Sequence, residues 1–564
     1  MPDISEMILS ENYADYILPT FPEFLEEYQN YGAQLFNNYY GMIHSLLPSD
    51  DVRDYYAQGL FYNTVPKLFS LLDTVSLDAS GITTVQNQPA LSLRGRGVLL
   101  GFIDTGIDYT HPAFRFSDGS SRIYGLWDQT VQSGTPPFDM MYGSGYTRED
   151  INEALASENP LDIVPSQDTI GHGTFLAGVA AGSSLPDENF IGAAPSGMIA
   201  VVKLKEAKRY LKDLFFHTSD EPVYQETDIM MGVRYFLRLA DVVQAPVVIC
   251  IGLGTNQGAH QGRTALANVL TNTTNYWGLY TSVAAGNEAG KAHHYLGETP
   301  DGDDYTSVEI IVRENTPGFT LELWGSPPEI YSVGFESPLG EVIRRLPTRI
   351  KFSDTVDFVL ERTRIFIASE VVQTVSGDQL IFFRFMNPTP GSWKIRVYAT
   401  GGDFGNFHMW LPISGFSNPD VTFLRPNPDT TVTVPAATVP LLTAGAYNAY
   451  NNSLFTNSSR GYTRDGSIKP DIAAPGVEVS GPAVGGGFTS LTGTSVAAAI
   501  TAGACALVVE WGAQRVPPRI FNQAELKALF IRGARRSPER IYPNKEWGYG
   551  VLDVYRIFTV FTSV

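Results

Sequence analysis

Cysteine is almost absent from this chain of 564 residues, which contains two, Cys250 and Cys505. Both stand in apolar stretches, so we interpret them as small buried hydrophobic residues. A chain of this length without a disulfide framework suits a reducing compartment, although exported bacterial proteins can also contain little cysteine.

Positive charge is also scarce, because 39 Lys and Arg residues face 59 Asp and Glu residues and the formal net charge is −20. This balance argues against a nucleic acid as the partner. The N-terminal stretch MPDISEMILSENY has neither a basic region nor a long apolar region, so we expect no signal peptide and synthesis in the cytoplasm. The most apolar run, LTGTSVAAAITAGACAL, is diluted by Ser, Thr and Gly, so we expect no membrane span.

Histidine is rare as well, with eight residues in the chain, and one of them has an unusual setting. His172 stands between two glycines, just before a helical run, where its ring is uncrowded. His293 and His294 are adjacent, but the sequence places no carboxylate or cysteine beside them, so we expect no metal and no cofactor. The remaining histidines are interpreted as packing, surface or turn residues: His44, His111, His217, His260 and His408.

Ser495 begins the run of small residues that follows Gly493 and Thr494. Ser and Thr are favoured at helix N-termini because their oxygens accept from free backbone N–H groups. The helix that follows is apolar or tiny on every side, which predicts complete burial. The stretch alone therefore leaves Ser495 open as a capping residue or as a nucleophile.

Asp104 ends the apolar run Val98 to Ile103, which predicts a buried strand. In open α/β sheets, sites form at the carboxyl ends of strands. The sequence Asp-Thr-Gly also suggests an aspartic protease, but such a site needs two carboxylates, and no second D-T-G or D-S-G follows. A simple turn aspartate is the other alternative.

Together these residues occur in the chain order Asp104, His172, Ser495, which is the order of the subtilisin triad. FIDTGID, GHGTFLAGVAAG and GTSVAAAITAG resemble the three signatures of the subtilisin-like serine proteases, the subtilases, over roughly residues 81–296 and 440–558. The resemblance implies that His172 is the general base for Ser495 and that Asp104 orients His172. Val496, Ala499 and Ile500 depart from the usual pattern at positions that do not carry the reaction.

Two further segments complete the resemblance. AAGN ends at Asn287, which the resemblance makes a side-chain donor to the oxyanion, and a turn asparagine otherwise. Gly252, Leu253 and Gly254 follow the predicted strand Val247 to Ile251 and resemble the segment that pairs with extended substrate.

The predicted fold class is α/β, with a subtilisin-like parallel sheet and helices on both faces. We predict four segments: a small α/β prodomain over 1–72, the subtilase domain over 73–296 and 440–564, and an inserted β-sandwich or jelly-roll-like domain over 297–439, where short β-rich runs recur. In the prodomain, PEFLEEYQNYGAQLF and SDDVRDYYAQ predict helices and NYYGMIHSLL a strand; the sandwich is expected to be a rigid insert or a binding module.

The insert, the intact triad residues and SLDASGI resemble one branch of the family, the clostridial germination proteases called Csp. That resemblance implies a serine endopeptidase that cuts its own prodomain once, between about Leu68 and Ser76, and keeps it in the active-site cleft. Its protein substrate would be a spore-germination zymogen, and the protein would be packaged in the spore. The alternative is a non-catalytic sensor or scaffold of the same fold.

Overall fold

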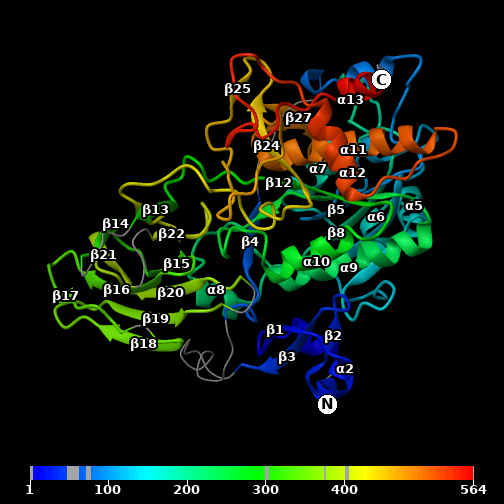
Figure 1. Ribbon diagram of the computed structural model, residues 1–564. Helices are drawn as coiled ribbons and strands as arrows, with labels where there is room; N and C mark the ends of the chain where they lie inside the picture. Colours follow the sequence, from blue (N-terminus) through cyan, green and yellow to red (C-terminus); the bar gives the residue numbers. More distant parts are fainter. Residues whose placement is uncertain are drawn as a thin grey trace.

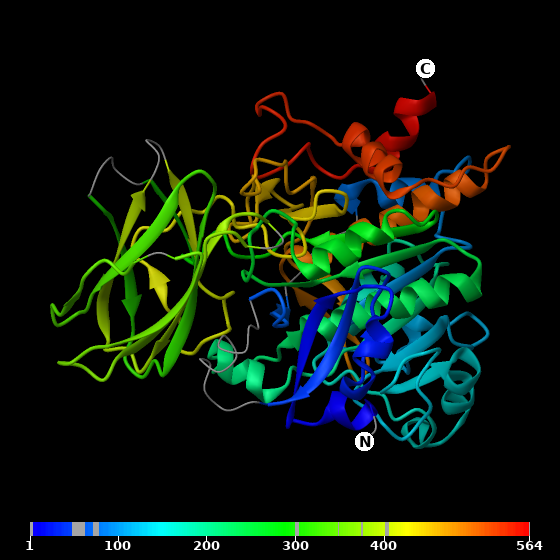
Figure 2. The ribbon, with the colours of Figure 1, turned by 60° about the horizontal axis from the view of Figure 1, so that its bottom comes forward.

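The computed structural model describes residues 4–47, 62–71, 78–298, 304–347, 349–373, 376–400 and 405–562. These residues form a large α/β body, a β-sandwich beside it and a small N-terminal unit, which comprises residues 4–47 and 62–71 (Figure 1). Figure 2 shows the N-terminal unit lying against the α/β body while the sandwich projects to one side.

The α/β body is built on a sheet of nine strands. Neighbouring strands from β24 to β6 run parallel, and the short strands β7 and β25 pair antiparallel at the two ends. Inner strands such as LLGFID and VVICI are buried along their whole length, as expected for a parallel sheet covered on both faces. The strands in spatial order are β25 (Ser453–Leu454), β24 (Leu442–Asn448), β12 (Leu279–Ala284), β10 (Val247–Ile251), β5 (Leu99–Asp104), β8 (Met198–Lys203), β6 (Ile123–Asp128) and β7 (Ser144–Thr147), with β26 (Ile472–Pro475) beside β24.

Helices cover both faces of this sheet, which confirms the predicted fold class. α7 (His172–Ala181) and α11 (Thr494–Ala513) lie on one face, and α9 (Glu226–Val243) and α10 (Ala265–Thr273) lie on the other (Figure 1). The two faces have separate apolar cores. Further helices of this body are α4 (Ile82–Asn87), α5 (Arg148–Ala156), α6 (Pro160–Ile163), α8 (Arg209–Phe215), α12 (Gln523–Gly533) and α13 (Val554–Thr562).

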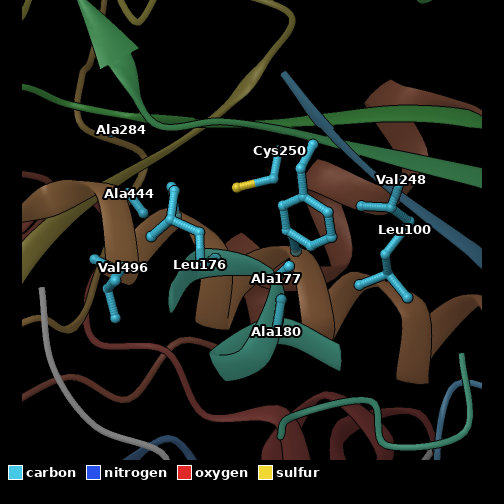
Figure 3. Packing of buried hydrophobic residues seen from close by; sticks show 14 of the residues in the cluster. Leu100, Leu176, Ala177, Ala180, Val248, Cys250, Ala284, Ala444 and Val496 are labelled. Carbon is cyan, nitrogen blue, oxygen red and sulfur yellow. The ribbon is translucent and has the colours of Figure 1, made fainter. Parts of the chain in front are cut away.

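α7 and α11 are made mostly of small residues, and this composition lets them approach each other and the sheet closely. In Figure 3, Leu176, Ala177 and Ala180 of α7 lie near Val496 of α11 and below Cys250 of the sheet. Among the described residues, α11 is the one helix long and apolar enough to cross a membrane, and 89% of its most apolar window is buried inside the fold. It is the central core helix.

The sandwich consists of two antiparallel sheets, with six and five strands, around an aromatic and aliphatic core. Its strands begin at His294, just before the predicted boundary at 297, and end at Phe423. The chain then returns to the α/β body, where Val434 pairs with Thr255. One sheet has the order β13 (His294–Glu298), β22 (Asn406–Trp410), β15 (Gly318–Gly325), β20 (Gln379–Met386), β19 (Arg364–Glu370), β18 (Lys351–Asp357), and the other β17 (Val342–Ile343), β16 (Ile330–Glu336), β21 (Gly391–Thr400), β14 (Thr306–Val312), β23 (Thr422–Phe423).

The N-terminal unit holds a three-stranded antiparallel sheet in the order β1 (Tyr13–Pro19), β3 (Tyr40–Leu46), β2 (Gln34–Leu35), with α1 (Ile4–Leu9) beside it. The predicted strand at 38–47 is present as β3. The helix predicted over 22–36 is mostly wrong: α2 covers only Phe24–Glu27, and the backbone turns at Gly32, whose φ is 61°, before β2 starts. The other predicted helix, at 49–58, lies outside the described residues.

Candidate active site

Asp104, His172 and Ser495 lie in one hydrogen-bonded row. His172 Nδ1 is 2.8 Å from Asp104 Oδ1, and His172 Nε2 is 3.1 Å from Ser495 Oγ. The side chain of His172 is 7% exposed and that of Asp104 is 1% exposed, while Ser495 is fully buried. The structure therefore brings together the three residues predicted from the sequence signatures.

The local folds explain how the three side chains meet. Asp104 is the last residue of β5, at the carboxyl edge of the sheet. His172 is the first residue of α7 and follows Gly171, whose φ of 92° strongly favours glycine. Ser495 lies in the first turn of α11, which has no side-chain cap. Ser495 is thus not a capping residue, and the first N–H groups of α11 have no carbonyl partner within the helix.

Gly252 lies directly beside the row. A Cβ atom at this position would lie 3.1 Å from Ser495 Cβ, 3.2 Å from His172 Cε1 and 2.6 Å from Leu176 Cδ1. A side chain would displace Ser495 and His172, so the site requires glycine here for steric reasons.

Asn287 follows β12 and is fixed to the start of α11. Its Oδ1 accepts from the backbone N–H of Thr494 at 3.0 Å and from the hydroxyl of Thr494 at 3.2 Å. The hydroxyl oxygen of Thr494 in turn accepts from the N–H of Gly286 at 3.0 Å. Because the amide oxygen is occupied in this way, the amide nitrogen is the group that Asn287 can offer to a substrate oxygen.

Sequence reasoning missed Glu288, whose buried side chain holds the loop after β12 in place. Its buried carboxylate accepts from the hydroxyl of Ser414 at 2.6 Å and lies 2.9 Å from Nδ1 of His293. Burial alone would raise the pKa of Glu288, but His293 and Ser414 lower it below the ordinary value. The sequence offers one signal for Glu288, its position directly after Asn287.

The N-terminal unit contributes one strand to the α/β body. β4 (Leu68–Leu71) lies between β9 (Tyr224–Gln225) and β11 (Leu253–Gly254) and pairs antiparallel with both. Leu68 and Phe69 are fully buried, and the N–H of Leu68 donates to Gln257 Oε1 at 3.0 Å. The predicted pairing segment Gly252–Gly254 therefore already holds an extended chain, which is the chain's own residues 68–71.

A second polar cluster, also missed, joins the N-terminal unit to the α/β body. Asp15 Oδ1 lies 2.7 Å from Nδ1 of His44 and 2.9 Å from Nζ of Lys208, and Asp15 Oδ2 accepts from Gln225 Nε2 at 2.7 Å. Burial alone would raise the pKa of Asp15, but Lys208 and His44 hold it well below its ordinary value. These residues, which we call the Asp15 cluster, lie far apart in sequence and belong to no recognisable motif.

The adjacent histidines His293 and His294 do not share a ligand. His293 faces Glu288, whereas Nε2 of His294 lies 2.9 Å from Nδ1 of His408. Across the described part of the chain, no group of three or more His, Cys, Asp or Glu side chains is placed to hold a metal ion.

Comparison with known proteins gives a consistent family match. The model of the subtilase family matches residues 95–403 and 395–550. Among solved structures, the CspB protease of Clostridium perfringens superposes with a TM-score of 0.75 at 29% identity, covering 86% of this chain and 99% of the other.

Curated relatives are longer proteins. The subtilisin-like protease SBT3.5 of Arabidopsis thaliana is 25% identical over 501 residues, covering 78% of this chain and 60% of its own length. The C5a peptidase of Streptococcus pyogenes serotype M1 is 37% identical over 473 residues, covering 76% of this chain and 36% of its own length. The chain thus spans less than two thirds of these relatives.

Proposed function

The chain belongs to the subtilase family, and we propose that it is a serine endopeptidase that first cuts its own N-terminal prodomain and then cleaves a protein substrate. The observation that carries the proposal is the row of hydrogen bonds from Asp104 through His172 to Ser495. A serine hydroxyl is a weak nucleophile unless a base takes its proton, and this row supplies that base.

In the proposed reaction, Ser495 Oγ attacks the carbonyl carbon of the scissile peptide bond while His172 Nε2 takes its proton. Asp104, bonded to Nδ1, keeps the other ring nitrogen free to act as the base and stabilises the imidazolium that forms. His172 then gives the proton to the leaving amine. Water enters by the same general-base step and releases the acyl group from Ser495.

The oxyanion forms near the start of α11. The N–H groups of its first turn after Thr494, whose own N–H is held by Asn287, and the amide nitrogen of Asn287 are the proposed donors. Donors fixed before the reaction stabilise the charge without reorganising, and Thr494 fixes Asn287 through its amide oxygen.

Residues 68–71 are proposed to occupy the groove as the last described part of the prodomain, with self-cleavage between about Leu68 and Ser76. The antiparallel pairing of β4 with β9 and β11 supports this proposal. Residues 72–77, which contain most of the predicted cleavage segment, lie outside the described residues. The Asp15 cluster and the groove pairing would both survive cleavage, so the freed prodomain is proposed to stay bound as an inhibitor.

We extend the proposal to the substrate on the basis of the Csp resemblance and the match to the CspB protease. The substrate is proposed to be a zymogen cleaved during spore germination, and the endopeptidase to act in the spore. A purified candidate zymogen should be cut at one site by the wild-type protein and left intact by Ser495→Ala.

The central test is the intact mass of protein purified through a C-terminal tag. Wild type and the control Ser453→Ala, a change at an exposed serine, should yield two co-purifying fragments. Ser495→Ala should yield one full-length chain. Two fragments from Ser495→Ala would show that another protease makes the cut, and an uncut wild-type chain without peptidase activity would favour a non-catalytic sensor or scaffold.

A further inference from the structure

Three arginines gather at the end of α7 opposite His172, and none of them has an acidic partner. Arg115, Arg122 and Arg148 make no ion pair within 4.0 Å in the part of the chain that the structure describes. The chain as a whole carries a net charge of −20, so an arginine group without carboxylates is unexpected. Because uncompensated positive charge is costly when buried, this group requires an explanation.

Arg122 is the most deeply buried of the three, at 1% exposure. Its Nη1 donates to the carbonyl of Ala181 at 2.6 Å and to the hydroxyl of Ser183 at 2.9 Å, and its Nη2 donates to the carbonyl of Gly197. Its Nε has no hydrogen-bond partner. Burial, and then the nearby charge of Arg148, lowers the pKa of Arg122 to about 10.

Arg115 and Arg148 also have buried guanidinium nitrogens without hydrogen-bond partners. The guanidinium of Arg115 donates to the carbonyl of Thr110, and its buried Nε has no partner. Arg148 lies over the rings of Phe116 and Tyr124, at 5.8 and 5.5 Å, and its Nε and Nη2 have no partner. Buried donors of this kind are rare in native structures, because each unmade hydrogen bond costs free energy.

A cavity of about 410 Å³ adjoins two of these arginines, whereas Arg148 lines a different cavity. Arg115 and Arg122 line it, together with the hydroxyl-bearing residues Ser117, Ser184 and Ser196. None of the lining residues is acidic. The acidic groups near these arginines in sequence do not line the cavity. Asp118 is fully exposed and accepts from Ser120, and Asp187 and Glu188 are exposed on a short turn. Glu149 lines the other cavity with Arg148, and Asp150 accepts from Thr147.

We propose that this cavity binds a phosphate group, free or as a small phosphomonoester. A carboxylate needs one guanidinium fork, whereas the charges here lie on separate side chains around a cavity that also presents hydroxyl donors. A tetrahedral dianion accepts hydrogen bonds in several directions and balances more than one positive charge. The cavity exceeds the size of phosphate alone, and the lining residues Pro112 and Leu185 offer apolar contacts to an organic body.

The purely structural alternative is that Arg122 only ties the carbonyl end of α7, where a positive charge complements the helix dipole. That role accounts for the contact with Ala181 but not for Arg115, which lines the same cavity and whose buried Nε has no hydrogen-bond partner. The phosphate site is independent of the peptidase reaction, because no residue of the Asp104–His172–Ser495 row lines the cavity.

The test is a titration of the full chain with inorganic phosphate and, separately, with glycerol 3-phosphate, read as melting temperature at constant ionic strength. Arg115→Gln is the informative variant, since this side chain is only partly buried, whereas Arg122→Gln removes contacts to three backbone carbonyls and one hydroxyl and risks misfolding. Arg209→Gln is the matched control, because it removes the same charge from a side chain that is 83% exposed.

Wild type and Arg209→Gln should show a saturable rise in melting temperature, and Arg115→Gln should bind phosphate at least tenfold more weakly while retaining wild-type peptide hydrolysis. A stronger response to glycerol 3-phosphate than to phosphate would identify the monoester as the ligand. Equal responses of wild type and Arg115→Gln would overturn the proposal. So would stabilisation by chloride as large as that by phosphate, because simple screening of the arginines then explains the effect.

Discussion

Two buried Asp–His pairs in this protein have nearly the same geometry and different settings. Asp104 and His172 lie 2.8 Å apart, and Asp15 and His44 lie 2.7 Å apart. In the first pair the remaining ring nitrogen faces the hydroxyl of Ser495, whereas in the second it faces the amide of Gln34. The comparison teaches that an aspartate–histidine pair is not catalytic in itself. Whether the pair catalyses a reaction or only holds two parts of the protein together depends on the side chain at the second ring nitrogen and on access to the substrate groove.

The largest expected effect is a difference in peptide turnover between variants of His172 and His44. His172→Ala should lower peptide turnover by about 10⁴- to 10⁶-fold, a range taken from another member of the family, because the base for Ser495 is lost. His44→Ala, the matched change in the other pair, should leave the turnover of mature enzyme within a few-fold of wild type. Because His172→Ala should not process itself, the prodomain of each variant is first separated by an added protease, and turnover of a peptide substrate is then measured; a comparable collapse in His44→Ala would end the distinction.

The second prediction concerns a variant that breaks the Asp15 cluster. Lys208→Met leaves the carboxylate of Asp15 buried without its ammonium partner, and breaking such a pair costs about 3–5 kcal/mol. The prodomain fragment should then bind the mature chain about 10²- to 10⁴-fold more weakly, as measured by its retention on the tagged mature chain. Lys212→Met is the control, because its ion pair with Glu206 is largely exposed. Equal retention in both variants would show that the groove strand alone holds the prodomain.

A smaller effect is expected for Asn287, the proposed oxyanion donor beside the Asp104–His172 pair. Asn287→Ala removes the proposed oxyanion donor and should slow turnover by about 10²- to 10³-fold, again a family value, with little change in KM. Asn287→Asp is a useful companion, because it keeps the acceptor for Thr494 and loses the donor. If turnover of Asn287→Ala fell less than threefold, Asn287 would be a turn residue only.

The smallest expected effect concerns a group of stacked histidine and tryptophan rings between the α/β body and the sandwich. The ring of His260 lies 4.1 Å from that of Trp410, with His294 and His408 stacked close by. Burial lowers the pKa of His260 to about 4 and that of His294 to about 3.

Because burial outweighs the two backbone carbonyls that His260 faces, both pKa values stay below that of the unfolded chain. The stability that follows is complete above the unfolded pKa of about 6.5 and falls as the pH drops toward 4. For His260 alone the loss is about 2 kcal/mol at pH 5. Denaturant unfolding at pH 8 and pH 5 measures it, and His260→Phe should reduce the difference between the two curves. An unchanged difference would assign the acid sensitivity to other groups.

The triad was predictable because each of its residues sits in a local signature: a strand end for Asp104, flanking glycines for His172 and a small-residue helix for Ser495. The Asp15 cluster was not, because Asp15 and Lys208 are 193 residues apart and neither has a distinctive neighbourhood. We interpreted His44 as a packing or surface residue, and only tertiary contacts give it a charged partner. The same holds for the arginines, whose missing partners are visible only in three dimensions.

The fold shows the same limit. Continuous apolar runs predicted the inner strands, and short β-rich runs predicted the sandwich strands β14, β15, β18, β20 and β21. The sequence did not reveal β13, β16, β17, β19, β22 and β23, and it did not indicate the pairing order. The helix expected over 22–36 was misjudged because its acidic and aromatic residues fit a helical pattern, whereas Gly32 and the pairing of Gln34 with Met42 end it early.

The position of the sandwich in the chain has a consequence for synthesis. His172 and Ser495 are 323 residues apart, and the sandwich is made between them. At about 5–20 residues per second, a nascent chain spends roughly 15 to 65 s with its aspartate and histidine translated and its nucleophile still missing. In that interval β9 and β11 are already available to receive β4. The order of translation thus lets the groove fill before the enzyme can cut anything, including the nascent chains on neighbouring ribosomes.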